Sequence, residues 1–121
     1  MADNRGYIRN ADERGSVNIS EEVISIITAV AAVDVEGVRG LFASPGKEIN
    51  KIIGRKALSR GVKLCVDGDN VTIDVYVMVE MGVPVNEVGL QVQRAVISAV
   101  ESTAGIKVNA VNVHICGISI R

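Results

Sequence analysis

The sequence predicts a small single-domain α+β protein, in which a mixed sheet carries its helices on one face. Three patterns carry this prediction. Apolar and polar residues alternate from Val71 to Met81, as they do along a half-buried strand. Two amphipathic segments with helical spacing lie on either side of that strand. The elements follow the order β-α-(loop or helix)-β-β-α-β, and helices in this order pack most economically on one sheet face.

The domain is expected to span residues 15–121. A chain of 121 residues is long enough to bury one hydrophobic core. Residues 1–14 mix charges of both signs without apolar periodicity, so we expect a flexible N-terminal tail there. The domain should begin with a short edge strand around Val17 and Ile19.

A first helix is expected to begin after Ser20. Serine is a good N-cap, and Glu21 and Glu22 then suit the positive end of the helix dipole. The helix should end near Val33 or Asp34. Helical spacing predicts a buried stripe made of Val23, Ile26, Ile27, Val30 and Ala31. Beyond a break at residues 44–46, residues 47–59 could form a loop or a loose helix.

The centre of the chain predicts a β-hairpin. The alternating residues Val62, Leu64 and Val66 precede the alternating strand that begins at Val71. The four residues between the two strands, 67–70, are Asp, Gly, Asp and Asn, which tolerate the left-handed backbone of a tight turn.

A second helix and a last strand complete the prediction. The helix should follow Pro84, end at Gly105 and bury Val85, Val88, Val92, Ala95, Val96, Ala99, Val100 and Thr103. In the last strand, Ile118 and Ile120 have the opposite parity to the apolar residues before them. A bulge at Gly117 would return both to the core side. A right-handed crossover makes this strand parallel to the strand at Val71.

The charge distribution is uneven, although the formal net charge is only −1. Basic residues gather in one segment, with only Glu48 opposing them; they are Lys47, Lys51, Arg55, Lys56, Arg60 and Lys63. This basic segment is either a solvated face or a contact for an anionic surface. With one Phe and two Tyr, the chain has few rings on which bases could stack, which argues against nucleic-acid binding.

The cellular compartment is predicted to be the cytoplasm. Two cysteines do not make a disulfide framework, and nothing resembles a signal peptide. The apolar stretches are too short and too interrupted to span a bilayer.

Three motifs are candidates for functional sites. The G-x-x-G sequence Gly37–Gly40 has the form of the clamp in KH modules, which predicts, as the alternative function, a nucleic-acid-binding module that also uses the basic segment. Cys65, His114 and Cys116 could share a sheet face and bind zinc, or be incidental small side chains. A catalytic triad would need the only histidine, His114, but no nucleophile motif accompanies it. We therefore predict no catalytic site, cofactor or metal.

The sequence resembles the alkaline shock protein (envelope stress response) family, found mainly in Gram-positive bacteria. The resemblance covers residues 15–120. It rests on Gly15-Ser16-Val17-Asn18-Ile19-Ser20, Glu22-Val23-Ile24, Gly37-Val38, Leu41, Gly61-Val62-Lys63, Val71-Thr72-Ile73-Asp74-Val75, Gly82, Val88, Gln91, Gln93, Gly105 and the ending from Val111 to Ile118. It implies a small cytoplasmic protein without known catalysis, some of whose relatives are held at the inner face of the membrane by a membrane-spanning partner.

These observations together predict a non-catalytic scaffold linked to cell-envelope homeostasis. A homo-oligomer is expected, because an exposed edge strand and the outer sheet face with Tyr76 and Met78 suit self-pairing. A membrane-anchored protein partner should hold it peripherally at the membrane. Direct lipid binding through the basic segment is expected to be weak or absent.

Overall fold

The computed structural model of the chain describes residues 7–42 and 61–120, and the side chains from residue 11 onward within them. Two helices and six strands in these ranges form a small α+β fold. The α+β class is as predicted, but the predicted order had four strands, and those at residues 7–12 and 38–41 were not expected. The elements are β1 (Tyr7–Asp12), β2 (Gly15–Ser20), α1 (Glu21–Val33), β3 (Val38–Leu41), β4 (Val62–Asp67), β5 (Asn70–Glu80), α3 (Val85–Ala104) and β6 (Ala110–Ser119). None of the helices in the described ranges is long and apolar enough to cross a membrane.

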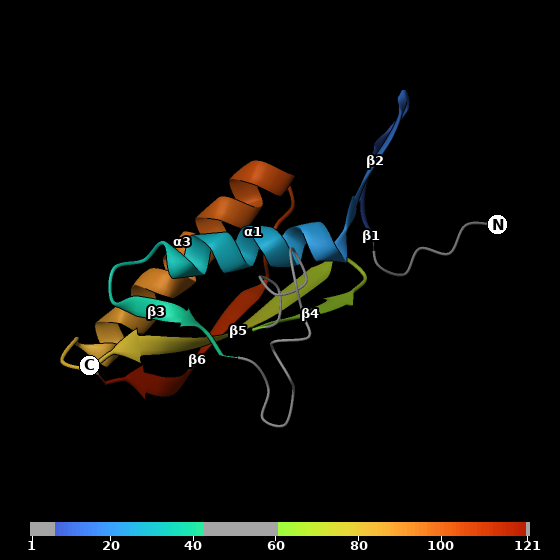
Figure 1. Cartoon of the computed structure of the whole chain (residues 1–121). Coiled ribbons are helices and arrows are strands. Elements are labelled where there is room, and N and C mark those ends of the chain that lie inside the picture. Colours follow the sequence, from blue (N-terminus) through green and yellow to red (C-terminus); the bar gives the residue numbers. More distant parts are fainter. Residues whose placement is uncertain (1–6, 43–60, 121) are drawn as a thin grey trace.

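The main sheet is mixed and is built around β5 (Figure 1). Along one edge of β5 runs β6, which is parallel to it, as the crossover rule predicts. Along the other edge lie two antiparallel strands, β3 beside the C-terminal half of β5 and β4 beside the N-terminal half. The two meet at Tyr76, whose backbone O accepts from Phe42 N and whose N donates to Gly61 O, both at 2.8 Å. The predicted hairpin of β4 and β5 is confirmed, with Asp67 opposite Asn70.

The bulge predicted in the last strand is also confirmed. Ile115 lies opposite Val77 and Gly117 lies opposite Met78, so Cys116 is the extra residue. The shift places Ile118 opposite Val79, which is on the core side of the sheet. Ile118 is nevertheless 52% exposed and Ile120, which follows β6, is 74% exposed, so neither side chain is buried in the core. They lie at the end of the outermost strand, where the described helices do not cover them.

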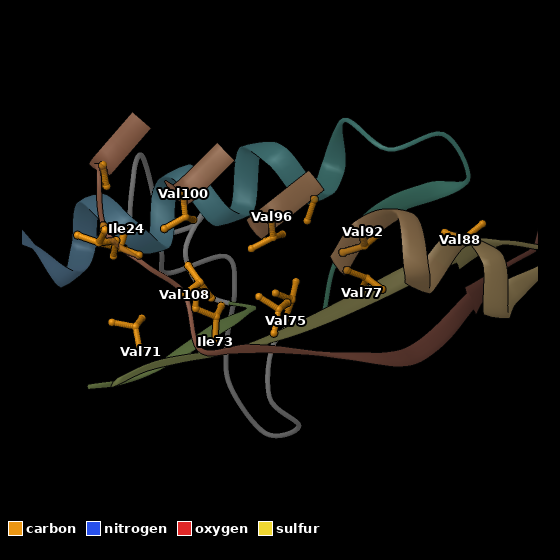
Figure 2. Packing of buried hydrophobic residues seen from close by; sticks show 14 of the residues in the cluster. Ile24, Val71, Ile73, Val75, Val77, Val88, Val92, Val96, Val100 and Val108 are labelled. Atoms are coloured by element: carbon orange, nitrogen blue, oxygen red, sulfur yellow. The ribbon is translucent and has the colours of Figure 1, made fainter. Parts of the chain in front are cut away.

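Both helices lie on one face of the main sheet, as predicted (Figure 1). Ser20 caps α1, because its Oγ accepts from Val23 N at 3.2 Å. Gly105 ends α3 in the left-handed conformation, with φ 71°. Between the helices and the sheet is a core of small branched side chains (Figure 2), which includes Ile24, Ile73, Val75, Val77, Val79, Val92, Val96 and Val100.

The predicted buried stripe of α1 has the wrong phase. The residues that α1 buries are Ile24, Thr28, Ala29 and Ala32. Ile27 and Ala31 pack at the margin of the core, whereas Val23 and Val30 are 42% and 51% exposed. The helix contacts α3 as well as the sheet. Alanine on the buried side allows this close approach, so packing selects the side with small residues over the side with larger ones.

The N-terminal segments form a separate two-stranded sheet. The strand expected around Val17 exists as β2, but it pairs antiparallel with β1 and not with the main sheet. Residues 7–12, which fall within the expected flexible tail, form β1. The expected loop or loose helix at residues 47–59 lies outside the described residues.

Candidate functional site

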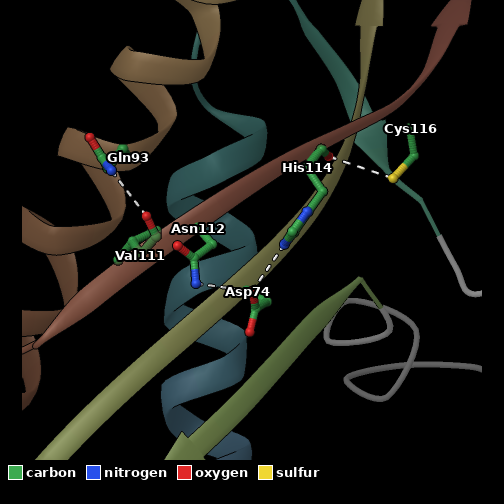
Figure 3. Close-up of polar contacts among 6 residues, drawn as sticks. All are labelled: Asp74, Gln93, Val111, Asn112, His114 and Cys116. Atoms are coloured by element: carbon green, nitrogen blue, oxygen red, sulfur yellow. Dashed lines mark hydrogen bonds and ion pairs between the residues drawn. The ribbon is translucent and has the colours of Figure 1, made fainter.

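The outer face of the main sheet, opposite the helices, carries a polar network that joins β5 to β6 (Figure 3). Asp74 on β5 is its centre. The carboxylate Oδ1 of Asp74 accepts from Asn112 Nδ2 at 3.2 Å and lies 3.0 Å from His114 Nε2. The Asp74 side chain is 23% exposed and the His114 side chain 43%, so water reaches the network.

The two residues predicted to form an interaction face lie on this same outer face. Tyr76 stacks on the His114 ring, with a centroid distance of 4.6 Å and an interplanar angle of 14°. Met78 lies against the bulge, since a Cβ at Gly117 would be 3.2 Å from Met78 Cγ. Both side chains are half-buried by these neighbours. The face therefore offers a stacked ring pair and a thioether beside a hydrogen-bonded carboxylate.

The Asp74–His114 pair was not predicted from the sequence. A signal for it existed, because both residues occupy outward positions on two strands predicted to be parallel neighbours. A histidine held by a carboxylate forms two parts of a catalytic triad. The thiol nearest in sequence, Cys116 Sγ, donates to the backbone O of His114 at 3.7 Å and not to its ring.

The three residues considered for zinc are not brought together. Cys65 lies opposite Thr72, while His114 lies opposite Tyr76, four residues further along β5. That spacing corresponds to about 13 Å along a strand, far beyond the reach of a shared ion. Within residues 7–42 and 61–120 there is no cluster of three His, Cys, Asp or Glu side chains that could hold a metal.

The outer edge of β6 is the second part of the candidate site. In the described part of the chain, β6 pairs only with β5. From Ala110 to Ile120 the sequence has no Lys, Arg, Asp, Glu or Pro, the residues that protect sheet edges in other proteins. Exposed apolar side chains adjoin this edge at Ile118, Ile120 and Leu90.

A groove of about 440 Å³ runs between β6 and the first half of α3. Its lining contains no Lys, Arg, Asp or Glu, and consists of Val85, Asn86, Gly89, Leu90, Gln93, Val111, Asn112, Val113, His114 and Ile115. Gln93 Nε2 donates to Val111 O at 3.0 Å and so links the helix to the strand. A groove of mixed apolar and amide side chains beside an open strand edge suits an extended chain, whose backbone can bond to the edge.

The G-x-x-G clamp hypothesis fails on local structure. A KH clamp is a loop between two helices, but here Val38–Leu41 is strand β3, and Gly40 lies opposite Met78 in the sheet. Gly37 is buried at φ +100°, where a Cβ would lie 3.0 Å from Val88 Cγ2. The glycines serve the turn and its packing against α3. Of the basic segment, Lys63 is exposed on β4, and the other five basic residues lie outside the described residues.

The fold and this surface define a small α+β domain with a mixed four-stranded sheet and an open sheet edge. The chain belongs to the alkaline shock protein 23 family, described as having a cell envelope-related function, whose model matches residues 9–120. This match confirms the resemblance that the sequence motifs indicated.

Several bacterial relatives are similar over most of their length. The chain is 32% identical to YloU of Bacillus subtilis over 108 residues, which cover 88% of this chain and 90% of YloU. It is 37% identical to Spy1535 of Streptococcus pyogenes over 86% of this chain and 79% of that protein. It is 33% identical to YqhY of Bacillus subtilis over 86% of this chain and 77% of YqhY.

A solved structure of a variant of the MamM CTD is similar in fold. The TM-score is 0.51 with 18% sequence identity, over 80% of this chain and 94% of that one. At this identity the likeness extends to the fold alone.

Proposed function

We propose that this protein is a non-catalytic scaffold that self-associates through β6 and acts in cell-envelope homeostasis. It works from the cytoplasmic side of the membrane, where a membrane-anchored protein partner holds it. The observation that carries the proposal is the long, uncharged and open edge of β6. The membership of a family with a cell envelope-related function supports the place of action.

Self-association follows from the properties of the β6 edge. A second copy can add its own β6 antiparallel to the first, which extends the main sheet across a two-fold axis. No charged side chain on β6 opposes this pairing. The exposed Ile118 and Ile120 lie at the same edge. Burying each would contribute up to about 1.5–3 kcal/mol, in addition to the backbone hydrogen bonds.

The outer face with Asp74, His114 and Tyr76 acts as a recognition surface and not as a catalytic centre in this proposal. His114 is already engaged on two sides, by the Asp74 carboxylate and by the Tyr76 ring. The face is part of a strand surface, and water reaches the side chains of both Asp74 and His114. Residues so arranged can donate hydrogen bonds and stack on a partner protein.

The test is the oligomeric state measured by light scattering at high micromolar concentration. The unmodified chain should be an oligomer, and the Ile118→Lys, Ile120→Lys double variant should be monomeric, because the added charges would meet at the interface. Val17→Lys is the matched control, since Val17 is 62% exposed and lies on β2, outside the main sheet. It should leave the oligomer intact. A strictly monomeric unmodified chain would overturn the proposal.

A further inference from the structure

The outward side of α1 is apolar, which is unusual for a surface helix. Four residues with the spacing 3, 4 and 3 lie within a narrow arc of the helix: Val23, Ile26, Val30 and Val33. Val23, Val30 and Val33 are 42%, 51% and 39% exposed, and Ile26 is half-buried. The opposite side of α1 packs in the core, so the helix is apolar all round. Helices of that kind are normally buried on every side.

Acidic residues flank this outer stripe at both ends. Between Gly15 and Val38 the chain has four acidic residues, Glu21, Glu22, Asp34 and Glu36, and no Lys, Arg or His. Glu22, Asp34 and Glu36 are exposed. Between Glu22 and Asp34 there is no charge of either sign. The surface thus has an uncharged centre about 18 Å long with a negative charge at each end.

The charge pattern on the outer face of α1 indicates what kind of partner can bind there. A second copy of α1 would place acidic ends against acidic ends in either orientation, so self-pairing is disfavoured. An anionic bilayer would be repelled by the same carboxylates. A helix with an apolar stripe of matching spacing and Lys or Arg near its two ends would bury the valines and form ion pairs with the carboxylates.

We propose that the outer face of α1 is the docking site for a basic amphipathic helix of the membrane-anchored partner. Segments that adjoin the cytoplasmic end of a membrane-spanning helix are rich in Lys and Arg, so they carry the required charge. The inference rests on the proposed tethering by a protein partner and assigns to that partner a surface separate from the β6 edge. Docking buries the three exposed valines and pairs the end carboxylates with cations.

The experiment uses two synthetic 18-residue helical peptides with the same leucine stripe. One carries Lys at its flanking positions and the other carries Glu. Binding to the full chain is measured by fluorescence anisotropy of the labelled peptide. The Lys peptide should bind at least tenfold more tightly than the Glu peptide. The Val23→Ser, Val30→Ser double variant should weaken Lys-peptide binding at least tenfold. Val17→Ser should leave it unchanged, because Val17 is also exposed, at 62%, but lies outside α1.

A charge swap separates docking on α1 from unspecific attraction to an acidic protein. In the Glu22→Lys, Asp34→Lys variant the preference should reverse, so that the Glu peptide binds more tightly. The control is Asp67→Lys, Asp69→Lys, which changes the net charge equally at the exposed β4–β5 turn and should keep the original preference.

Each other outcome overturns the inference. Equal binding of the two peptides, absence of binding, or an equal loss in the α1 and control variants excludes a basic helix at α1. If Val23→Ser, Val30→Ser instead dissolves the oligomer or abolishes vesicle binding, the occupant is a second copy or a lipid surface. Light scattering of the same samples distinguishes a failure of this inference from a failure of the proposed self-association, because self-association through β6 can persist when no peptide binds to α1.

Discussion

His114 Nε2 lies 3.0 Å from Asp74 Oδ1, and this contact joins the outer faces of β5 and β6 across 40 residues of sequence. The two side chains are not directly opposite in the register, because Asp74 faces Asn112 and Tyr76 faces His114. The ring of His114 therefore reaches diagonally to the carboxylate while it stacks on Tyr76. This diagonal contact and the stacking fix the orientation of the imidazole on an otherwise open face.

A double-mutant cycle on Asp74→Ala and His114→Ala should give a coupling energy of about 0.2–1 kcal/mol in the free energy of unfolding, since both side chains are accessible to water. Urea denaturation of the four proteins measures it. Asn112→Ala provides the control, because Asn112 donates to the same Oδ1 atom and its removal leaves the His114 contact in place. A coupling above about 2 kcal/mol would contradict a surface pair.

The phase of α1 can be tested with two alanine substitutions in the same helix. Ile24→Ala removes a fully buried side chain and should lower the free energy of unfolding by about 2–5 kcal/mol. Val30→Ala, at a residue that is 51% exposed, should change it by no more than about 0.5 kcal/mol. Chemical denaturation gives both values. Similar losses at the two sites would show that the stripe with Val30 is the buried one.

The two glycines of the G-x-x-G sequence should respond differently to alanine. Gly37→Ala combines a positive φ with a contact of 3.0 Å to Val88 Cγ2, and should cost more than about 1 kcal/mol. A Cβ at Gly40 meets nothing within 4 Å, so Gly40→Ala should be neutral or slightly stabilising. Thermal unfolding of both variants measures the two changes in stability. A large loss at Gly40 would mean that β3 is not packed as described.

Direct lipid binding should be weak, even though the basic segment carries six cations. Each basic residue near an anionic bilayer contributes about 1 kcal/mol, and that attraction is screened by salt. Vesicle co-sedimentation at physiological salt should recover little protein, and Lys51→Glu, Arg55→Glu should reduce the recovery further. The matched charge reversal Arg94→Glu, Lys107→Glu, outside the basic segment, should have a smaller effect. Tight binding of the purified chain to anionic vesicles would refute this expectation.

Most of the main sheet could be predicted from local patterns, because strand alternation and turn residues act over short distances. The alternation of β5, the Asp67–Asn70 turn and the parity change at Gly117 each had one simple structural solution. The helix crossover then fixed the direction of β6. These features share one property, which is that a single face of each strand is consistently apolar.

The phase of α1 could not be predicted in the same way, because the helix is apolar all round. From Val23 to Val33 its sequence offers no polar face that would mark the solvent side. The choice between the Val23–Val30 side and the Ile24–Ala32 side depends on how closely α3 and the sheet approach. The distance between these elements is a property of the tertiary structure. A short distance favours the side of α1 that carries alanines.

The candidate site was predictable only in part. Tyr76 and Met78 were expected on the outer face from parity alone, and they lie there. The Asp74–His114 contact and the open edge of β6 depend on which strands are neighbours and which strand is outermost. Strand parity does not contain that information. Strand β1 was missed because residues 7–12 lie in a stretch of mixed charges without apolar periodicity.

The central claim, that a second copy pairs with the outer edge of β6, is tested most directly by hydrogen exchange at two protein concentrations. Tyr76 N and O bond to Gly61 and Phe42 on the other edge of β5, so the odd-numbered residues of β5 bond to β6. In a parallel pair the residue directly opposite a bonded residue points away from it, so the amides of Val113, Ile115 and Ile118 face the open edge. We predict that these three amides are protected at high micromolar concentration and exchange at least tenfold faster after dilution, while amides of the β4–β5 pair are unchanged. Rates at Val113, Ile115 and Ile118 that are fast and independent of concentration would contradict the account.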